Sequence, residues 1–269
     1  MVVFPESVGT ILGAMKVYAD WVKKPVEEPE VFLNVKPDLA KKLIDQSRHL
    51  GSIGEVLTRP LLEAYGIPLV PANIAENEDD AIRVANEIGY PVVTKINSPD
   101  ILHKSDLGGI RLDLNDAASV RQAYQEMIST VQTKMPNARI EGVLIEATAP
   151  KGQEVIIGMK RDPGFGPVMM FGLGGIFVEL FKDVSFRVSP LTRNDAYDMI
   201  QSTRAGKLLT GYRGQKPADL DAVVDTILRL SQLALNFEEI EEIEINPLLV
   251  MEKGCLALDG RVILKQSAG

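Results

Sequence analysis

Residues 91–110 gather side chains that could handle phosphate groups. The apolar pair Val92-Val93 predicts a short buried strand, which places the ammonium group of Lys95 where the chain leaves the core. A lysine in such a position is partly desolvated and can reach an anion. Lys95 is therefore a candidate phosphate-binding residue.

The loop after Lys95 adds a second cation and a titratable imidazole. It contains His103, Lys104 and Asp106 and is closed by the pair Gly108-Gly109, whose backbone N–H groups can line an anion-binding concavity. For each residue alone, a surface turn with an incidental charge is the alternative interpretation. Their combination in one short stretch favours phosphate chemistry.

A second candidate site lies near the C-terminus, where oxygen ligands follow one another on predicted strands. Glu244 and Asn246 are two residues apart and so share one face of a strand. If the next strand is its antiparallel neighbour, the Asn246 amide oxygen and the Asp259 carboxylate could bind one hard cation such as Mg²⁺. The alternative is structural, because Asn-Pro often opens a turn and Asp-Gly often forms a hairpin turn.

A glycine loop follows the apolar run 168–171. Gly172, Gly174 and Gly175 resemble half of a dinucleotide-binding fingerprint, but their spacing is not G-x-G-x-x-G. Glycines that a tight connection needs for its backbone geometry would give the same pattern. Both interpretations remain open from the sequence.

Length and charge limit the classes of partner. The chain has 269 residues, of which 45% are hydrophobic and 25% charged, enough for one large or two modest domains. Its formal charge of −8 argues against nucleic acid or an anionic membrane as the main partner. A polyanionic ligand must therefore be bound by local cations.

The cellular setting follows from what the sequence does not contain. Cys255 is the single cysteine, so an internal disulfide is excluded and a reducing compartment is indicated. The N-terminus has no basic signal-like region, and no apolar run reaches the roughly 20 residues of a membrane span. We expect a cytoplasmic protein.

Short strands of alternating polarity predict a mixed α/β protein with antiparallel or mixed sheets rather than a regular βαβ series. Helices are expected at 53–65, 79–89, 116–131, 193–202 and 217–236. Strands are expected at 67–71, 92–96, 109–113, 140–145, 154–159, 167–171, 184–188, 243–250 and 255–264.

The N-terminal part follows a different pattern. Apolar residues at helical spacing predict a helix over 8–22, and the acidic, proline-containing stretch 25–30 predicts an extended linker. An isolated helix has too little apolar surface to fold alone, so we expect it to complete a neighbouring domain.

The motifs together resemble the ATP-grasp part of the NDP-forming acyl-CoA synthetases, such as the beta subunit of ADP-forming acetyl-CoA synthetase, which is related to the succinyl-CoA synthetase beta subunit. The resemblance covers roughly residues 46–265. It rests on Lys95, His-Lys-Ser-Asp-x-Gly-Gly at 103–109, Arg-Asp-Pro-x-Phe-Gly-Pro at 161–167, Phe-Gly-Leu-Gly-Gly at 171–175 and Glu-Ile-Asn-Pro-Leu at 244–248.

This resemblance implies a two-lobed fold of α/β (α+β) class. We expect residues 1–45 to be the tail of an upstream CoA-ligase domain with a linker. The ATP-grasp domain would then span 46–269, with a small lobe at about 73–140 and a large lobe at about 46–72 plus 141–269.

It also implies roles for individual residues. His103 matches a loop histidine that accepts a phosphoryl group, and Asn246 and Asp259 match a magnesium-binding pair. The segment from Val143 to Ala147 matches a hinge that holds adenine through backbone groups, although Glu146-Ala147-Thr148 stands where many relatives have Gln-Glu-Met. The implied nucleotide-binding residues are Lys95, Lys104, Val143, Ile145, Glu146, Ala147, Glu154, Gly174 and Gly175.

The implied reaction is acyl-CoA + ADP + phosphate ⇌ carboxylic acid + CoA + ATP, through a phosphohistidine. ATP or ADP, phosphate, Mg²⁺ and CoA-binding domains in the same or another chain would be the partners. Two alternatives remain: a nucleotide-sensing module of a synthetase-like protein acetyltransferase, and an ATP-grasp carboxylate–amine ligase, which needs no histidine.

Overall fold

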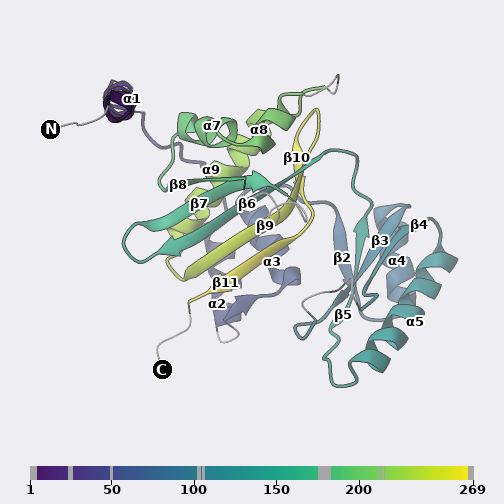
Figure 1. Ribbon diagram of the computed structural model, residues 1–269. Helices are drawn as coiled ribbons and strands as arrows, with labels where there is room; N and C mark the ends of the chain where they lie inside the picture. The colour runs from purple at the N-terminus through teal and green to yellow at the C-terminus, as the bar shows by residue number, and fades with distance from the viewer. Residues whose placement is uncertain are drawn as a thin grey trace.

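Two antiparallel sheets, each covered by helices, form the body of the computed structural model (Figure 1). The structure describes residues 5–23, 27–48, 51–101, 104, 107–174, 183–211, 214 and 216–265. The expected two-lobed fold of mixed helices and antiparallel sheets is confirmed.

The larger sheet has seven strands within the described residues, in the order β1-β11-β9-β6-β7-β8, with β10 also paired to β9. Along β6, Val155, Ile157 and Met159 are buried in the core, whereas Gly158 and Lys160 lie on the opposite face. The strands are β1 (Ser52–Ile53), β6 (Gln153–Asp162), β7 (Gly166–Leu173), β8 (Val184–Val188), β9 (Ile240–Val250), β10 (Cys255–Ala257) and β11 (Gly260–Leu264).

Helices bury their apolar sides against this sheet in one large core. The longest of them in this part of the chain, α9 (Leu220–Asn236), begins at Asp219, whose carboxylate accepts a hydrogen bond from the Ala222 N–H over 3.1 Å. The other helices of this core are α2 (Pro37–Ser47), α3 (Glu55–Ala64), α7 (Arg193–Gln201) and α8 (Arg204–Leu209).

The smaller sheet has the strand order β2-β5-β3-β4, with α4 and α5 packed on one face. Both helices begin at a side chain that satisfies a free backbone N–H: Asn77 accepts from Asp80, and Asp116 forms a capping box with Ser119. The elements are β2 (Ala72–Ala75), α4 (Glu78–Ile88), β3 (Val92–Asn97), β4 (Ile110–Leu114), α5 (Ala117–Lys134) and β5 (Gly142–Ala147).

Two expected boundaries are corrected by the strand pairing. Residues 141–147 were expected in the large lobe, but β5 pairs with β2 and β3, which makes it a central strand of the small sheet. The strand expected at 67–71 is reduced to a single bridge between Leu69 and Ala257, because Pro68 and Pro71 have no N–H to give to a ladder. The regular strand begins only at Ala72.

The expected N-terminal helix is confirmed as α1 (Pro5–Val22). In Figure 1 it lies at the edge of the molecule, beyond α7. Its apolar side chains are exposed: Val8, Ile11, Leu12, Met15, Val17, Tyr18 and Val22. Of the helices that are described, none has both the length and the apolar character of a membrane span.

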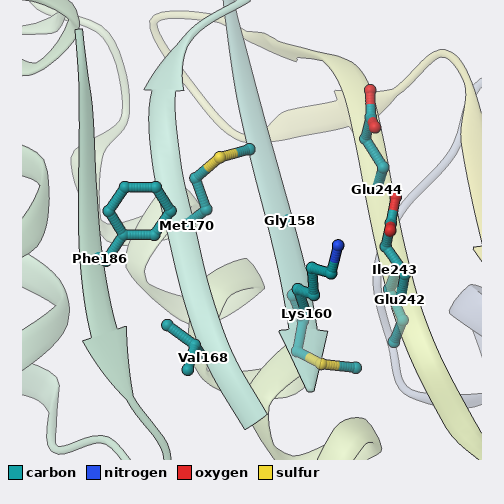
Figure 2. Close-up of a pocket in the computed structure, with 9 residues that line it drawn as sticks. Gly158, Lys160, Val168, Met170, Phe186, Glu242, Ile243 and Glu244 are labelled. Carbon is teal, nitrogen blue, oxygen red and sulfur yellow. The ribbon is translucent and has the colours of Figure 1, made fainter. Parts of the chain in front are cut away.

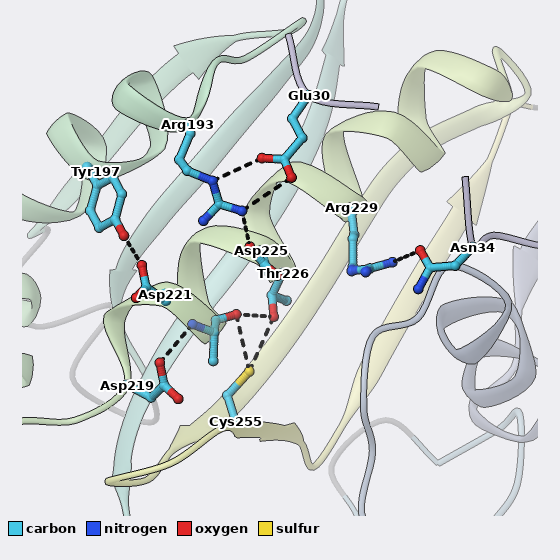
Figure 3. Close-up of polar contacts among 11 residues, drawn as sticks. Glu30, Asn34, Arg193, Tyr197, Asp219, Asp221, Asp225, Thr226, Arg229 and Cys255 are labelled. Atoms are coloured by element: carbon cyan, nitrogen blue, oxygen red, sulfur yellow. Dashed lines mark hydrogen bonds and ion pairs between the residues drawn. The ribbon is translucent and has the colours of Figure 1, made fainter. Parts of the chain in front are cut away.

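The segment that follows α1 packs more closely than a linker would. We call residues 27–36 the strap. Phe32 in the strap is only 9% exposed, and the Arg229 guanidinium lies 4.0 Å from the centre of its ring. Glu30 accepts a hydrogen bond from Arg193 over 3.0 Å (Figure 3). The packed unit therefore begins before residue 46, where the domain was expected to start.

Candidate functional site

Lys95 lies where the two lobes meet. Its ammonium nitrogen is 3.1 Å from both carboxylate oxygens of Glu146, on the neighbouring strand β5. It also donates to the carbonyl oxygen of Leu258, in the large lobe, over 3.3 Å. The Lys95 side chain is 14% exposed, which agrees with the expected partial desolvation.

Glu146 is the centre of a buried charged cluster. Its carboxylate is held from one side by Lys95 and from the other by Arg59 of α3, whose Nη1 is 3.5 Å from Oε2. Arg59 also donates to the carbonyl oxygen of Val70, at the entry to the small lobe. Burial raises the pKa of Glu146, and the charges of Lys95 and Arg59 oppose that rise.

The two expected metal ligands are brought together. The backbone N–H of Asn246 donates to the carbonyl oxygen of Asp259 over 3.2 Å, because β9 and β11 are antiparallel neighbours and Asp259 precedes β11. The Asn246 side-chain nitrogen donates to Glu244 over 3.2 Å. Lys95 contacts Leu258, the residue before Asp259, so the backbone next to this pair reaches the lobe junction.

A cavity of about 530 Å³ opens beside Asp259, and neither Lys95 nor Asn246 is among the residues that line it. It is lined by Asp259 and Arg261 of the large lobe, by Asn97 of the small lobe, and by Glu55 and Lys104, which form an ion pair with each other. Glu55 Oε1 is buried without a hydrogen-bond partner, while its other oxygen accepts from Lys104. The cavity thus combines acidic and basic side chains from both lobes.

Asp259 is an unusual acid in this setting. Burial and the nearby Glu55 carboxylate raise its pKa to about 6, against the opposing charges of Lys95 and Lys104. Ionising a buried carboxyl group costs free energy, and a cation placed beside it stabilises the ionised form. The charge pattern therefore suits a site that receives a positive ion.

The segment Val143 to Ala147, expected to hold adenine through backbone groups, lies in β5, and its role in nucleotide binding stays a prediction. Val143 and Ile145 are fully buried in the small-lobe core, so their side chains do not reach the cavity. The strand is paired on both sides, and the N–H of Ala147 donates to Pro71. Within β5, the side chain that reaches the lobe junction is that of Glu146.

The other expected nucleotide-binding residues lie apart from Lys95. Glu154 is exposed at the start of β6, and its carbonyl oxygen accepts from the N–H of Gly174 over 3.2 Å. A Cβ at position 174 would lie 2.8 Å from the Val155 carbonyl carbon, so this glycine permits close backbone approach. His103 and Gly175 lie outside the described residues.

The open face of the large sheet continues from Glu244 into a groove of about 290 Å³. Figure 2 shows Lys160, Glu242 and Glu244 beside the apolar side chains of Met170 and Phe186. Lys160 is paired in register with Glu242, so opposite charges are cross-strand neighbours. The groove lies on the strand that carries Asn246.

Sequence reasoning does not predict Arg59 and Glu55. They are four residues apart on a predicted helix, the spacing of an ordinary exposed ion pair. One signal was available: Arg59 is three residues before Leu62 and so lies on the apolar side of the helix. A charge on that side indicates a buried partner.

Comparison with known proteins agrees with this geometry. The family model described as "ATP-grasp domain" matches residues 45–264. Acetate–CoA ligase [ADP-forming] I of Archaeoglobus fulgidus is 45% identical over 90% of this chain and 35% of its own length. The beta subunit of the corresponding Pyrococcus furiosus enzyme is 47% identical over 77% of this chain and 89% of its own length.

Solved structures give the same result. Acetyl-coenzyme A synthetase 1 of Ca. Korarchaeum cryptofilum, in complex with coenzyme A and Ca-AMPCP, aligns with a TM-score of 0.81 and 45% identity over 84% of this chain and all of that chain. A second structure of that protein contains Mg-AMPPCP and aligns with a TM-score of 0.76 at 41% identity over 84% of this chain.

The chain spans only about a third of the length of the single-chain ligases it matches, such as the A. fulgidus enzyme, but nearly all of the separate beta subunit. The two sheets, the lysine at their junction and these similarities have one explanation. The chain belongs to the ATP-grasp family, in the group formed by the beta subunits and beta-subunit-like parts of ADP-forming acetate–CoA ligases.

Proposed function

We propose that this chain is the nucleotide-binding, phosphoryl-transferring part of an ADP-forming acyl-CoA ligase. The observation that carries the proposal is the contact of Lys95 Nζ with Leu258, the residue before Asp259. This contact supports a site in which the ammonium group and the proposed metal ligand Asp259 act on one phosphate chain. Phosphoryl transfer needs this combination, because its catalysis is mainly positioning and charge neutralisation.

The donor set fits Mg²⁺. Asp259 offers a carboxylate and Asn246 an amide oxygen, which are hard donors. Burial and the Glu55 carboxylate raise the pKa of Asp259, and a cation beside it would oppose that rise. An ion held by these two residues would take its remaining ligands from phosphates and water. When bound, Mg²⁺ would neutralise phosphate charge.

The protein groups would then act as follows. Lys95 would bind the nucleotide phosphates, and Asn246 and Asp259 would hold the metal. Lys104, now paired with Glu55, would release that carboxylate and bind a phosphate group as the second cation of the site. In the transfer step, an imidazole nitrogen of His103 would bond to the γ-phosphorus of ATP while ADP leaves, which gives phosphohistidine and ADP.

The proposal is tested by nucleotide binding and by histidine phosphorylation. Titration calorimetry should detect Mg-ADP and Mg-ATP binding to the chain, weakened at least tenfold in K95M. Incubation with γ-labelled ATP should give an acid-labile phosphate that H103A cannot form. Absence of nucleotide binding would refute the proposal, whereas binding without labelling would favour a nucleotide sensor.

The partner would be a CoA-binding unit, and we propose that it covers α1. The exposed apolar side chains of Leu12, Met15 and Val17 need a partner surface. A 4-hydroxybutyrate–CoA ligase of Nitrosopumilus maritimus matches 96% of this chain but extends far beyond it, since the match covers 38% of its length. Most of α1 thus has a counterpart in a longer single-chain ligase.

This surface and the division of labour can be tested together. Alone, the chain should bind nucleotide but form no acyl-CoA. Adding the CoA-binding part of the N. maritimus ligase should slow hydrogen exchange at the α1 amides, and L12S/M15S should abolish that protection. Acyl-CoA synthesis by the chain alone, or unchanged exchange in α1, would contradict the proposal.

A further inference from the structure

Arg59 has a function in nucleotide binding without contacting the nucleotide. We propose that it is a positioning residue that neutralises Glu146, so that the positive charge of Lys95 remains available to a phosphate group. The inference deepens the proposed function and rests on it. It assigns a role to a residue on α3 that the family resemblance does not include among the binding residues.

The first step is the charge of the cluster. Both oxygens of Glu146 lie 3.1 Å from Lys95 Nζ, so this lysine and this carboxylate alone would form a neutral pair. A neutral pair attracts a polyphosphate only weakly. The Arg59 guanidinium, 3.5 Å from Glu146, brings the net charge of the three groups to +1.

The second step is burial. The side chains of Arg59, Glu146 and Lys95 are 9%, 5% and 14% exposed, so water screens their charges poorly. Of the three, Lys95 is the most exposed, and its ammonium group also reaches the Leu258 carbonyl oxygen beside Asp259. The excess positive charge can therefore be used by a ligand at Lys95 rather than at Arg59.

The third step is the fixed position of Arg59. Its Nη2 donates to the carbonyl oxygen of Val70, and its backbone belongs to α3, which packs on the large lobe. Glu146 and Lys95 belong to the small sheet. Arg59 therefore holds the carboxylate in place from across the lobe junction, and Glu146 in turn orients Lys95.

A purely structural role for Arg59 would also connect the two lobes, so stability alone does not test the proposal. The two roles differ in their dependence on Glu146. If Arg59 acts by neutralising that carboxylate, its removal matters only while the carboxylate is present. If it acts as a general brace, its removal costs the same affinity with or without the carboxylate.

The experiment is a double-mutant cycle on nucleotide affinity. The affinities for ADP and for adenosine are measured by displacement of a fluorescent ADP analogue. The proteins compared are the wild-type chain, R59M, E146Q and R59M/E146Q. R83M, which removes an exposed ion pair, is the control. R59M should weaken ADP binding at least fivefold and adenosine binding less than twofold. In the E146Q background, R59M should change the ADP affinity less than twofold. R83M in the wild-type chain should also change the ADP affinity less than twofold.

Other results would overturn the inference. Equal losses of ADP affinity in both backgrounds, or equal losses for ADP and adenosine, would show that Arg59 does not act through the charge of Glu146. If R59M does not fold, the comparison of E146Q with R59M/E146Q still tests the inference, because neither variant has a buried carboxylate at position 146 without Arg59. An ADP affinity more than fivefold weaker in R59M/E146Q than in E146Q refutes the inference. Failure of the wild type to bind ADP would refute the proposed function itself.

Discussion

The backbone N–H of Asn246 donates a hydrogen bond to the carbonyl oxygen of Asp259 over 3.2 Å. This contact joins β9 to the turn before β11, and the residue before Asp259 in that turn, Leu258, accepts a hydrogen bond from Lys95 of the small sheet. The following predictions concern this junction and the elements that support it.

Asp259 should limit the stability of the metal-free chain at neutral pH. Its pKa is raised from 3.8 to about 6, so the folded state binds a proton more tightly than the unfolded state. Stability therefore falls as pH rises between these values. At pH 7, D259N should raise the free energy of unfolding by about 1–3 kcal/mol.

Urea unfolding without Mg²⁺ measures this effect. Near pH 4 the difference between D259N and wild type should shrink to below about 1 kcal/mol, because Asp259 is then protonated in the folded state and nearly half protonated in the unfolded state. D79N, at an exposed carboxylate, is the control and should have little effect at either pH. Destabilisation by D259N at pH 7 would contradict the prediction.

Glu55 should set the pH at which the metal–nucleotide complex is lost. If Asp259 holds the metal as proposed, binding of Mg-AMPPCP requires its ionised form and should weaken as pH falls through about 6. Glu55 is a neighbouring charge that raises the pKa of Asp259. E55Q should move the midpoint to lower pH by roughly 0.5–1 unit.

Calorimetric titrations from pH 5 to pH 8 give this midpoint. E63Q changes an exposed glutamate on the same helix and should leave the midpoint in place. An upward or absent shift in E55Q would mean that the Glu55 carboxylate does not act on Asp259.

Gly174 should be required for packing. An added Cβ would lie 2.8 Å from the carbonyl carbon of Val155 and 2.9 Å from its nitrogen and oxygen. G174A should therefore destabilise the chain by about 1–3 kcal/mol. G164A is the control, because its Cβ would meet nothing closer than Asp162 Oδ1 at 3.4 Å.

Thermal unfolding of the two glycine variants separates the two interpretations of this loop. A stability loss in G174A alone supports the structural one. If instead G174A unfolds like wild type but loses nucleotide affinity, the phosphate-binding interpretation is correct and the packing argument is wrong.

Phe32 should anchor the strap. It is 9% exposed and packs under Arg229, whereas its neighbour Leu33 is 92% exposed. F32A should lower the free energy of unfolding by about 2–4 kcal/mol, because a buried aromatic ring is lost. L33A should change it by less than about 0.5 kcal/mol.

Denaturant unfolding of both variants checks this, with the slope of the transition showing whether two-state behaviour is kept. Similar stabilities for F32A and L33A would mean that the strap contributes nothing to the folded unit. The expected domain boundary at residue 46 would then be correct.

Much of the fold can be predicted from local patterns. The apolar runs that became β3 and β6, and the acidic start of α4, are signals that tertiary structure does not overturn. By contrast, α2 is not predicted, because the proline-rich stretch before it was interpreted as a linker, although Ala40, Leu43 and Ile44 have helical spacing and face the core.

The site divides in the same way. The meeting of Asn246 and Asp259 follows from the antiparallel pairing of β9 with β11, although β10 lies between them in a stretch expected to be one strand, 255–264. The contact of Arg59 with Glu146 joins elements from different lobes, and no periodicity encodes it. The burial of Val143 and Ile145 agrees with the apolar strand expected over 140–145, whereas the backbone contacts to adenine stay a prediction.

The chain enters the small sheet and leaves it through neighbouring strands: Ala72 at the start of β2 is paired with Glu146 near the end of β5. The small sheet is thus an insertion whose two ends are adjacent, and a short turn could replace it without changing the strand order of the large sheet. The remaining large lobe would keep Asn246 and Asp259 but lose Lys95, so the proposed metal ligands and the proposed phosphate-binding lysine belong to parts of the chain that could be separated and recombined.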